Sequence, residues 1–306
     1  MAKKKVAEEL GGDLLELGSE EAWLKHRLAT MTGTDAAVIA RTSRYESRHG
    51  LWLKKTGRLV EDRTVSNNAE ERYGPAYWGI KLEPDLRETF AEDKGFKVVQ
   101  DPEWAVRLHP EKKWMSGSLD GHVYDPDHGW GVFEAKTAGL FLEDAWKDGK
   151  VPKSYLVQVM HYMGVTGYQF AWFAVLIGGQ KYRTFFIERV DSFVDMLMDA
   201  EEAFFKNVTE DVPVEIDGHP EEANVLSTMF PIDDGETVDL PAVALEWDQE
   251  RTLAIETLEK GRDARASAEN NIKACIGDAS YGILPDGVGR YSWKGKPRRL
   301  LRQGSK

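Results

Sequence analysis

The chain has 306 residues, of which 42% are hydrophobic and 30% are charged, and its formal net charge is −12. This apolar content suffices for a sizeable core. The longest strongly apolar run, Phe170 to Ile177, is too short to cross a bilayer, and the positively charged N-terminal segment lacks a following apolar stretch. The single cysteine excludes an internal disulfide. We therefore expect no membrane span, no signal peptide and a cytoplasmic location in a reducing cytosol.

Charge is distributed unevenly along the chain. Residues 210–259 contain fifteen acidic residues and one basic residue, whereas residues 285–306 contain seven basic residues and one acidic residue. A net charge of −12 taken alone argues against binding to nucleic acid. A DNA channel, however, needs only a local positive lining, so the uneven distribution leaves nucleic-acid binding open.

The first part of the chain is expected to be helical. Residues 20–28 have apolar side chains at helical spacing, and the polar segment from Thr32 to Asp35 is typical of a loop that caps a second helix beginning near Asp35. A stripe of period four over residues 75–94 predicts a third helix, in which Pro84 would introduce a kink or a break.

After Gly95 the pattern becomes typical of strands, with helices between and after them. Gly178 and Gly179 predict a tight connection between the last two strands. The expected order is strand 96–100, strand 114–123, strand 131–137, helix 153–166, strand 170–177, strand 182–188 and a helix over 193–204. Farther along, residues 246–275 predict a long polar helix and residues 282–301 a small basic hairpin.

This order predicts an α/β (α+β) fold with a central mixed β-sheet flanked by helices. No glycine-rich phosphate-binding motif follows a predicted strand, which excludes a doubly wound nucleotide-binding fold. We expect three parts: a core over residues 1–206, an acidic connector over 207–243, and a C-terminal accessory helix with a basic hairpin over 244–306.

The most informative residues are Asp120, Glu134 and Lys136. Side chains alternate along a strand, so Glu134 and Lys136 share one face, and a hairpin-like return would bring Asp120 beside them. Two carboxylates can hold a hard cation such as Mg²⁺, and an ammonium group can orient water and offset phosphate charge. The bare pattern alone favours an ordinary ion pair on a surface strand. The apolar neighbours Val132 and Phe133 favour a functional site, because charge in apolar surroundings requires compensation.

Asp120 followed by Glu134-x-Lys136 resembles the active-site signature of the PD-(D/E)xK nuclease superfamily. The chain resembles in particular the lambda exonuclease / YqaJ-type viral recombinase family. Five segments in the expected order carry this resemblance: Trp23-Leu24-x-x-Arg27 with Thr32-Gly33-Thr34-Asp35-Ala36-Ala37; Trp78-Gly79-x-x-Leu82-Glu83-Pro84; Ser118-x-Asp120-Gly121; Glu134-Ala135-Lys136-Thr137; and Tyr155-x-x-Gln158-x-x-His161-Tyr162-Met163.

The resemblance implies a role for each matching residue. The implied metal ligands are Glu83, Asp120, Glu134 and the carbonyl group of Ala135. Among the implied catalytic residues Asp120, Glu134, Lys136 and Gln158, Lys136 would be the catalytic lysine, and Gln158 would contact the metal-site water or the substrate.

Arg27, Thr34 and Ser118 would form a pocket for a terminal 5′-phosphate, with Thr34 in place of the serine common in the family. Three of the residues with an implied role also have an ordinary structural alternative. Arg27 could form a surface salt bridge, Glu83 could be a solvent-facing helix residue, and Gln158 could belong to a polar helix face.

The resemblance also implies a location in the cytosol of a bacterial host, with a phage or prophage as a source of the gene, and an activity. The activity is that of a Mg²⁺-dependent exonuclease, with Mn²⁺ as an alternative cofactor, that digests one strand of linear double-stranded DNA in the 5′→3′ direction. The 3′ single-stranded tails would serve recombination by a partner single-strand annealing protein, and the enzyme would form a ring-shaped homotrimer. The rival hypotheses are a restriction or junction-resolving endonuclease of the same superfamily and a catalytically idle DNA-binding scaffold.

Overall fold

The computed structural model describes residues 10–60, 68–297 and 299–304. The chain divides into two compact units, Met1–Ile232 and Asp233–Lys306. The elements of the first unit are β1 (Asp13–Glu16), α2 (Glu20–Ala29), α3 (Gly33–Ile39), α4 (Arg48–Lys55), α5 (Ala69–Arg72), α6 (Pro75–Lys94), β2 (Lys97–Val99), β3 (Ala105–Leu108), β4 (Ser116–Gly117), β5 (Gly121–Asp125), β6 (Gly129–Ala138), η1 (Leu140–Trp146), α7 (Lys153–Thr166), β7 (Phe170–Ile177), β8 (Lys181–Glu188), α8 (Asp191–Thr209) and α9 (Glu222–Met229). Those of the second unit are α10 (Ala244–Ile276), β9 (Tyr281–Ile283), η2 (Pro285–Gly287), β10 (Gly289–Lys294) and β11 (Arg299–Gly304).

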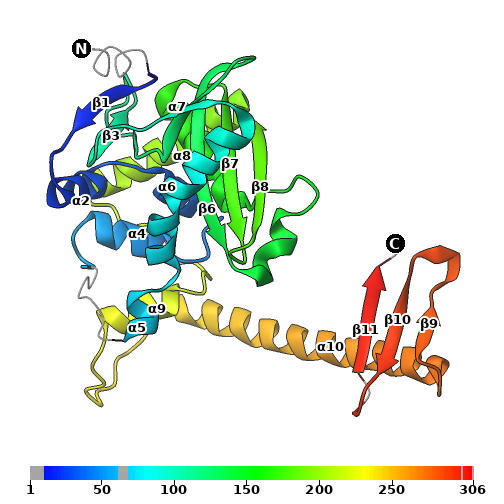
Figure 1. Ribbon diagram of the computed structural model, residues 1–306. Coiled ribbons are helices and arrows are strands. Elements are labelled where there is room, and N and C mark those ends of the chain that lie inside the picture. Colours follow the sequence, from blue (N-terminus) through cyan, green and yellow to red (C-terminus); the bar gives the residue numbers. More distant parts are fainter. Residues whose placement is uncertain (1–9, 61–67, 298, 305–306) are drawn as a thin grey trace. The chain divides into compact units, whose positions relative to one another are not determined.

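A five-stranded mixed sheet in the order β2-β5-β6-β7-β8 forms the centre of the first unit (Figure 1). The pair β6–β7 is parallel, and the other neighbouring pairs are antiparallel. The parallel pair requires a crossover between its strands, and α7 lies in that connection. The central mixed sheet flanked by helices is thus confirmed.

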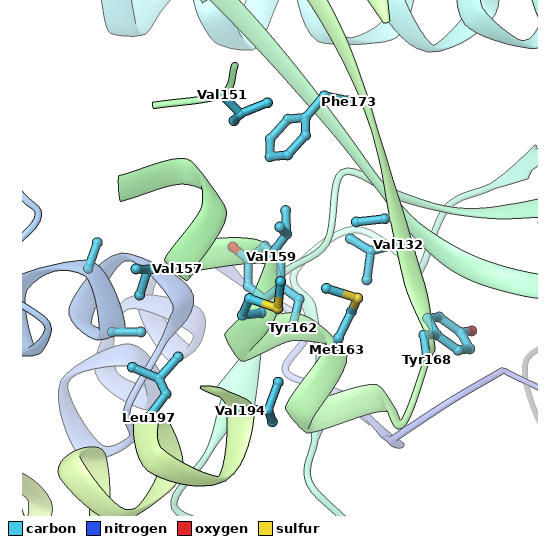
Figure 2. Packing of buried hydrophobic residues seen from close by; sticks show 14 of the residues in the cluster. Val132, Val151, Val157, Val159, Tyr162, Met163, Tyr168, Phe173, Val194 and Leu197 are labelled. Carbon is cyan, nitrogen blue, oxygen red and sulfur yellow. The ribbon is translucent and has the colours of Figure 1, made fainter. Parts of the chain in front are cut away.

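Helices cover both faces of this sheet. Successive side chains of β6 point to opposite faces, so each face has apolar side chains for a helix to cover. Phe133 packs against Phe90 of α6, with 5.0 Å between the ring centroids. Its neighbour Val132 points the other way, into a buried cluster that includes Val159 and Met163 of α7 (Figure 2). Burying each such side chain contributes about 1.5–3 kcal/mol, so the two clusters fix which face of β6 meets α6 and which meets α7.

The predicted single strand over residues 114–123 is wrong. The segment forms β4 and β5, which belong to different sheets, because β4 pairs with β3 in a small sheet of order β1-β3-β4. Gly117 at the end of β4 lies so close to Tyr162 that a Cβ atom would come within 2.9 Å of the ring. Residues 118–120 cross between the two sheets, so Asp120 lies in this crossing rather than within a strand.

The third predicted helix is not broken at Pro84, since α6 continues through this residue. A proline lacks the N–H group that would bond to the carbonyl four residues earlier, here that of Ile80. Both Pro84 and Ile80 are exposed, so water can satisfy that carbonyl.

The connector and the C-terminal region contain more structure than the sequence suggested. Helix α9 lies within the expected irregular connector, and its buried residue Glu222 is 2.6 Å from the Nδ1 atom of His49 in α4. The predicted C-terminal hairpin is present as β10 and β11, with β9 as a third strand on β10. Across residues 10–60, 68–297 and 299–304, no helix combines the length and apolar character needed to cross a membrane.

A buried polar junction connects α7, α8 and β4 at His161. Its Nδ1 atom is 3.0 Å from both carboxylate oxygens of Glu201, and its Nε2 atom is 3.0 Å from the carbonyl oxygen of Ser116. Both ring nitrogens therefore face acceptors, an arrangement that suits an imidazolium with two N–H donors. Burial alone would lower the pKa of His161, but the charge and hydrogen bond of Glu201 outweigh it and raise this pKa above 6.5.

This junction predicts a pH-dependent contribution to stability. Because the pKa of His161 is higher in the folded chain, its contribution is fully present below about pH 6.5, the unfolded pKa, and is lost as the pH rises through the folded pKa. Urea unfolding of wild type and of His161→Gln should therefore show a difference in unfolding free energy that is largest in mild acid and shrinks in alkali. A difference that grew with pH would contradict the charged state of His161.

Candidate active site

Asp120, Glu134 and Lys136 come together at the middle of the central sheet. Glu134 and Lys136 lie on the same face of β6 as Val132, the face that meets α7. Asp120 directly precedes β5, whose first residue Gly121 pairs with Phe133. The Oδ2 atom of Asp120 accepts a hydrogen bond of 2.9 Å from the backbone N–H of Ala135, which lies between Glu134 and Lys136. The register of β5 and β6 therefore fixes all three groups relative to one another.

Glu134 is a buried carboxylate with one partner missing. Its Oε1 atom forms an ion pair with Lys136. Its Oε2 atom is buried and has no hydrogen-bond partner among the residues that the structure describes. Burial, together with the negative charge of Asp120, raises the pKa of Glu134 to about 8. Burial alone would lower the pKa of Lys136, but the charges of Glu134 and Asp120 outweigh it and raise this pKa.

Glu83 on α6 belongs to the same group of charges. Burial, and then the charge of Asp120, raise the pKa of Glu83. Arg87, one helical turn farther along α6, donates to Glu83 Oε1 at 3.1 Å and to the backbone carbonyl of Asp120 at 2.5 Å. It thereby connects α6 to the crossing before β5. The sequence reasoning missed Arg87, although its i, i+4 spacing from Glu83 could have indicated a pair.

A cavity of about 630 Å³ opens beside these groups. Its wall includes the four residues Glu83, Asp120, Ala135 and Lys136, while Glu134 lies buried next to Lys136. In the part of the chain that the structure describes, no three His, Cys, Asp or Glu residues are grouped as a ready cluster for a metal ion. The donor chemistry nevertheless fits a hard divalent cation, because carboxylate and carbonyl oxygens are its preferred ligands and Glu134 Oε2 is unsatisfied.

Arg27 and Thr34 line a second cavity, of about 390 Å³. The guanidinium group of Arg27 lies over the ring of Trp23, 4.7 Å from its centroid. Lys55 lines the same cavity, but its ammonium group is buried and forms a 2.6 Å ion pair with Asp35. Lys54 also lines the cavity and is paired with Glu46 at 2.7 Å. Among the described cations of this wall, Arg27 is therefore the one that can meet an anionic ligand without first separating an ion pair.

Ser118 and Gln158 occupy positions near these groups rather than in the wall of the second cavity. The hydroxyl group of Ser118 accepts a 2.9 Å hydrogen bond from the indole N–H of Trp23, the residue over which Arg27 stacks. Gln158 donates to the hydroxyl group of Tyr162 at 3.0 Å. Burial, and then the charge of Glu134, raise the pKa of Tyr162, which places this tyrosine within the electrostatic reach of the first cavity.

Tyr162 links the two halves of the candidate site and was assigned no role from sequence. Gly33 at the start of α3 lies so close to it that a Cβ atom would come within 2.6 Å of the ring and 3.0 Å of the Cγ atom of Gln158. Thr34 follows directly on α3. The motif that carries Gln158 had already included Tyr162, so its position in the sequence was the available signal.

The chain is similar to proteins of one family. The model of the YqaJ-like viral recombinase domain matches residues 22–169. The uncharacterized protein YqaJ of Bacillus subtilis (strain 168) is 32% identical over 282 residues, which cover 90% of this chain and 83% of that protein.

Solved structures give weaker similarities. An alkaline exonuclease (LHK-Exo) from Laribacter hongkongensis matches with a TM-score of 0.48 and 19% identity, over 70% of this chain and 100% of that chain. A phage related exonuclease from Haemophilus somnus 129PT matches with a TM-score of 0.38 and 16% identity, over 60% of this chain and 95% of that chain. The extent and identity of the match to the Bacillus protein, together with the domain match, show that the chain belongs to the YqaJ-like viral recombinase family.

Proposed function

We propose that this protein is a Mg²⁺-dependent exonuclease that digests one strand of linear double-stranded DNA in the 5′→3′ direction. The observation that carries the proposal is the meeting of Asp120, Glu134 and Lys136 beside one cavity, with an unsatisfied carboxylate oxygen on Glu134. Membership of a viral recombinase family supports DNA as the substrate.

Each residue has a role that its surroundings support. Glu83, Asp120, Glu134 and the carbonyl group of Ala135 would hold the cation. When bound, Mg²⁺ or Mn²⁺ supplies Lewis-acid polarisation of the phosphoryl oxygen. The ammonium group of Lys136 orients the attacking water and offsets the charge that develops on the phosphate.

The remaining residues position the reacting groups and the end of the DNA. Arg87 holds the crossing that carries Asp120, through its bond to the Asp120 carbonyl. Gln158 contacts the water or the substrate. Arg27, Thr34 and Ser118 bind the terminal 5′-phosphate, with the guanidinium group as the main donor. Attack of water on phosphorus with cleavage of the P–O3′ bond leaves a new 5′-phosphate on the shortened strand, so the same pocket can receive each successive end.

Family membership also supports the ring-shaped assembly and the role in recombination that the resemblance implies. The enzyme would act in the cytoplasm as a ring-shaped homotrimer around DNA. Its 3′ single-stranded tails would pass to a partner single-strand annealing protein.

A substrate comparison tests the activity. Linear duplexes labelled at the 5′ or the 3′ end, and covalently closed circles of the same sequence, are incubated with and without Mg²⁺. Early release of the 5′ label from linear DNA alone, and only with the cation, is the expected result. Cleavage of closed circles would support an endonuclease instead, and inertness towards every substrate would support a DNA-binding scaffold.

Arg27→Ala should weaken the preference for phosphorylated ends. Loss of a charge-assisted hydrogen bond costs about 1.5–3 kcal/mol, so the preference for 5′-phosphoryl over 5′-hydroxyl ends should fall by about 10- to 100-fold. The ratio of initial rates on the two substrates measures it. Lys25→Ala removes the same charge from an exposed position of the same helix and should leave the ratio unchanged. An unchanged ratio in Arg27→Ala would refute the phosphate pocket.

A further inference from the structure

The C-terminal sheet has one face that is covered and one that is open. Gly282 in β9 lies so close to Ile276 at the end of α10 that a Cβ atom would come within 2.8 Å of its side chain. Side chains alternate along a strand, so the even-numbered positions of β9 face the helix and the odd-numbered positions face away. Tyr281 and Ile283 accordingly belong to the open face, and 44% and 82% of their respective surfaces are exposed.

The strand register shows which other residues share the open face. Ile283 lies opposite Arg290, and Tyr281 lies opposite Ser292. On the other side of β10, Gln303, Leu301 and Arg299 lie opposite Arg290, Ser292 and Lys294 respectively. Tyr281, Ser292 and Leu301 therefore form a central row, in which Ser292 is buried between its two exposed neighbours. This row lies between one row that contains Arg290 and another formed by Lys294 and Arg299. Two residues along a strand span about 6.6 Å, which is the approximate separation of neighbouring rows.

Two cations of this face, Arg290 and Lys294, have neutral hydrogen-bond partners. Arg290 donates to the side-chain carbonyl of Gln303 at 2.6 Å, and Lys294 donates to the hydroxyl group of Tyr281. The ring of Tyr281 also lies 5.0 Å from the Arg290 guanidinium and 3.9 Å from the Lys294 ammonium. Asp286 is the only acidic residue between 285 and 306, although the whole chain carries a charge of −12. The patch therefore concentrates positive charge around an exposed aromatic ring.

We propose that this open face binds single-stranded DNA. Cations on both sides of the central row can pair with phosphates, while Tyr281 and Leu301 offer surface to bases that are not paired. Duplex DNA keeps its bases stacked inside, so it could use the cations but would leave the exposed ring and Leu301, with 62% of its surface exposed, without an apolar contact. The inference deepens the proposed function and rests on it, because the 3′ tail that the exonuclease would leave is a single strand.

Binding of a fluorescein-labelled oligothymidine by the full-length protein tests the inference. Fluorescence anisotropy is measured in EDTA, so that no hydrolysis takes place. The triple variant Arg290→Ala/Lys294→Ala/Arg299→Ala is expected to raise Kd by about 10-fold or more, and to reduce the slope of log K against log salt concentration by about 2, because each lost phosphate contact removes about 0.7. The control Lys260→Ala/Arg262→Ala/Arg265→Ala removes equal charge from exposed positions of α10 and should leave Kd nearly unchanged.

Tyr281 provides an independent variant that leaves the charges in place. Tyr281→Ala should raise Kd by about 5-fold or more, as expected for the loss of one stacked base, and Tyr281→Phe should restore binding. Circular dichroism confirms that each variant is folded. An unchanged Kd and salt slope in the triple variant would overturn the inference. So would equal weakening of duplex and single-strand binding in that variant together with no effect of Tyr281→Ala, because the cations would then serve duplex DNA.

The same assay separates this inference from the proposed activity. Single-strand binding in EDTA by a protein that digests no DNA would contradict the exonuclease and leave the binding face supported. Digestion of linear duplexes at the normal rate without any single-strand binding would overturn only the binding face.

Discussion

Replacing Glu134 with glutamine is expected to reduce hydrolysis of linear DNA by about three orders of magnitude, which corresponds to roughly 4 kcal/mol of lost transition-state stabilisation. Glutamine keeps the size of the side chain but removes the charge that would hold the cation. It also removes the carboxylate partner of Lys136. Single-turnover cleavage of a 5′-labelled duplex measures the effect. Glu188→Gln, an exposed position at the end of β8, serves as the matched control and should retain full activity.

Thermal unfolding separates a lost metal site from a lost fold. A cation that binds only the folded chain stabilises it by about 2.7 kcal/mol at 100 times its Kd. Wild type should therefore melt at a higher temperature with Mg²⁺ than with EDTA, whereas Glu134→Gln should melt at nearly the same temperature in both. A variant that kept the Mg²⁺-dependent shift, or kept its nuclease activity, would contradict the role of Glu134 as a ligand.

Asp101→Asn is expected to destabilise the fold by about 3–5 kcal/mol, because it leaves a buried guanidinium without its counter-ion. Arg107 in β3 is fully buried and bonds Asp101 through both Nε, at 3.0 Å, and Nη2, at 2.5 Å. His122 of β5 is 3.0 Å from the same carboxylate. The group thus links the small sheet to the central one. Urea unfolding measures the loss, and Asp199→Asn, at an exposed position of α8, should cost little.

The pH dependence of this variant gives a second check. Burial alone would raise the pKa of Asp101, but the hydrogen bonds and charges of His122 and Arg107 lower it to about 2. A carboxyl group with a lowered pKa in the folded state contributes stability above its unfolded pKa of about 3.9, and loses that contribution as the pH falls towards 2. The difference in unfolding free energy between wild type and Asp101→Asn should hold above pH 4 and shrink below it. A gap that stayed constant down to pH 2 would rule out this ion pair as the cause.

The central sheet could be predicted because its strands carry local signals. β6 and β7 are apolar runs of strand length, and Gly178 and Gly179 mark the turn before β8. Alternation along β6 was also sufficient to place Glu134 and Lys136 on one face. What the alternation could not show is the depth of burial of Glu134, which depends on the helices that cover the sheet.

The small sheet escaped prediction because its pairing is entirely long-range. β1 pairs with β3 about ninety residues later, and each has only four residues, too few for a clear alternation. The same limitation explains the wrong strand over residues 114–123, since nothing local shows that its two ends belong to different sheets. Arg87 and Tyr162 each have one partner on their own helix, Glu83 and Gln158 respectively, which the sequence could indicate. Their contacts with Asp120 and Gly33 are long-range and could not be predicted from local pattern.

The position of β6 between β5 and β7 has a consequence for how the candidate site forms during synthesis. Glu134 is level with Phe173 of β7, a strand that leaves the ribosome only after α7 has been synthesised. Until β7 is present, the edge of β6 that carries this pairing has no partner strand. A nascent or prematurely terminated chain that ends before β7 would therefore lack the assembled candidate site. In a cell that translates this gene, the proposed nuclease activity would be confined to chains that have passed this point.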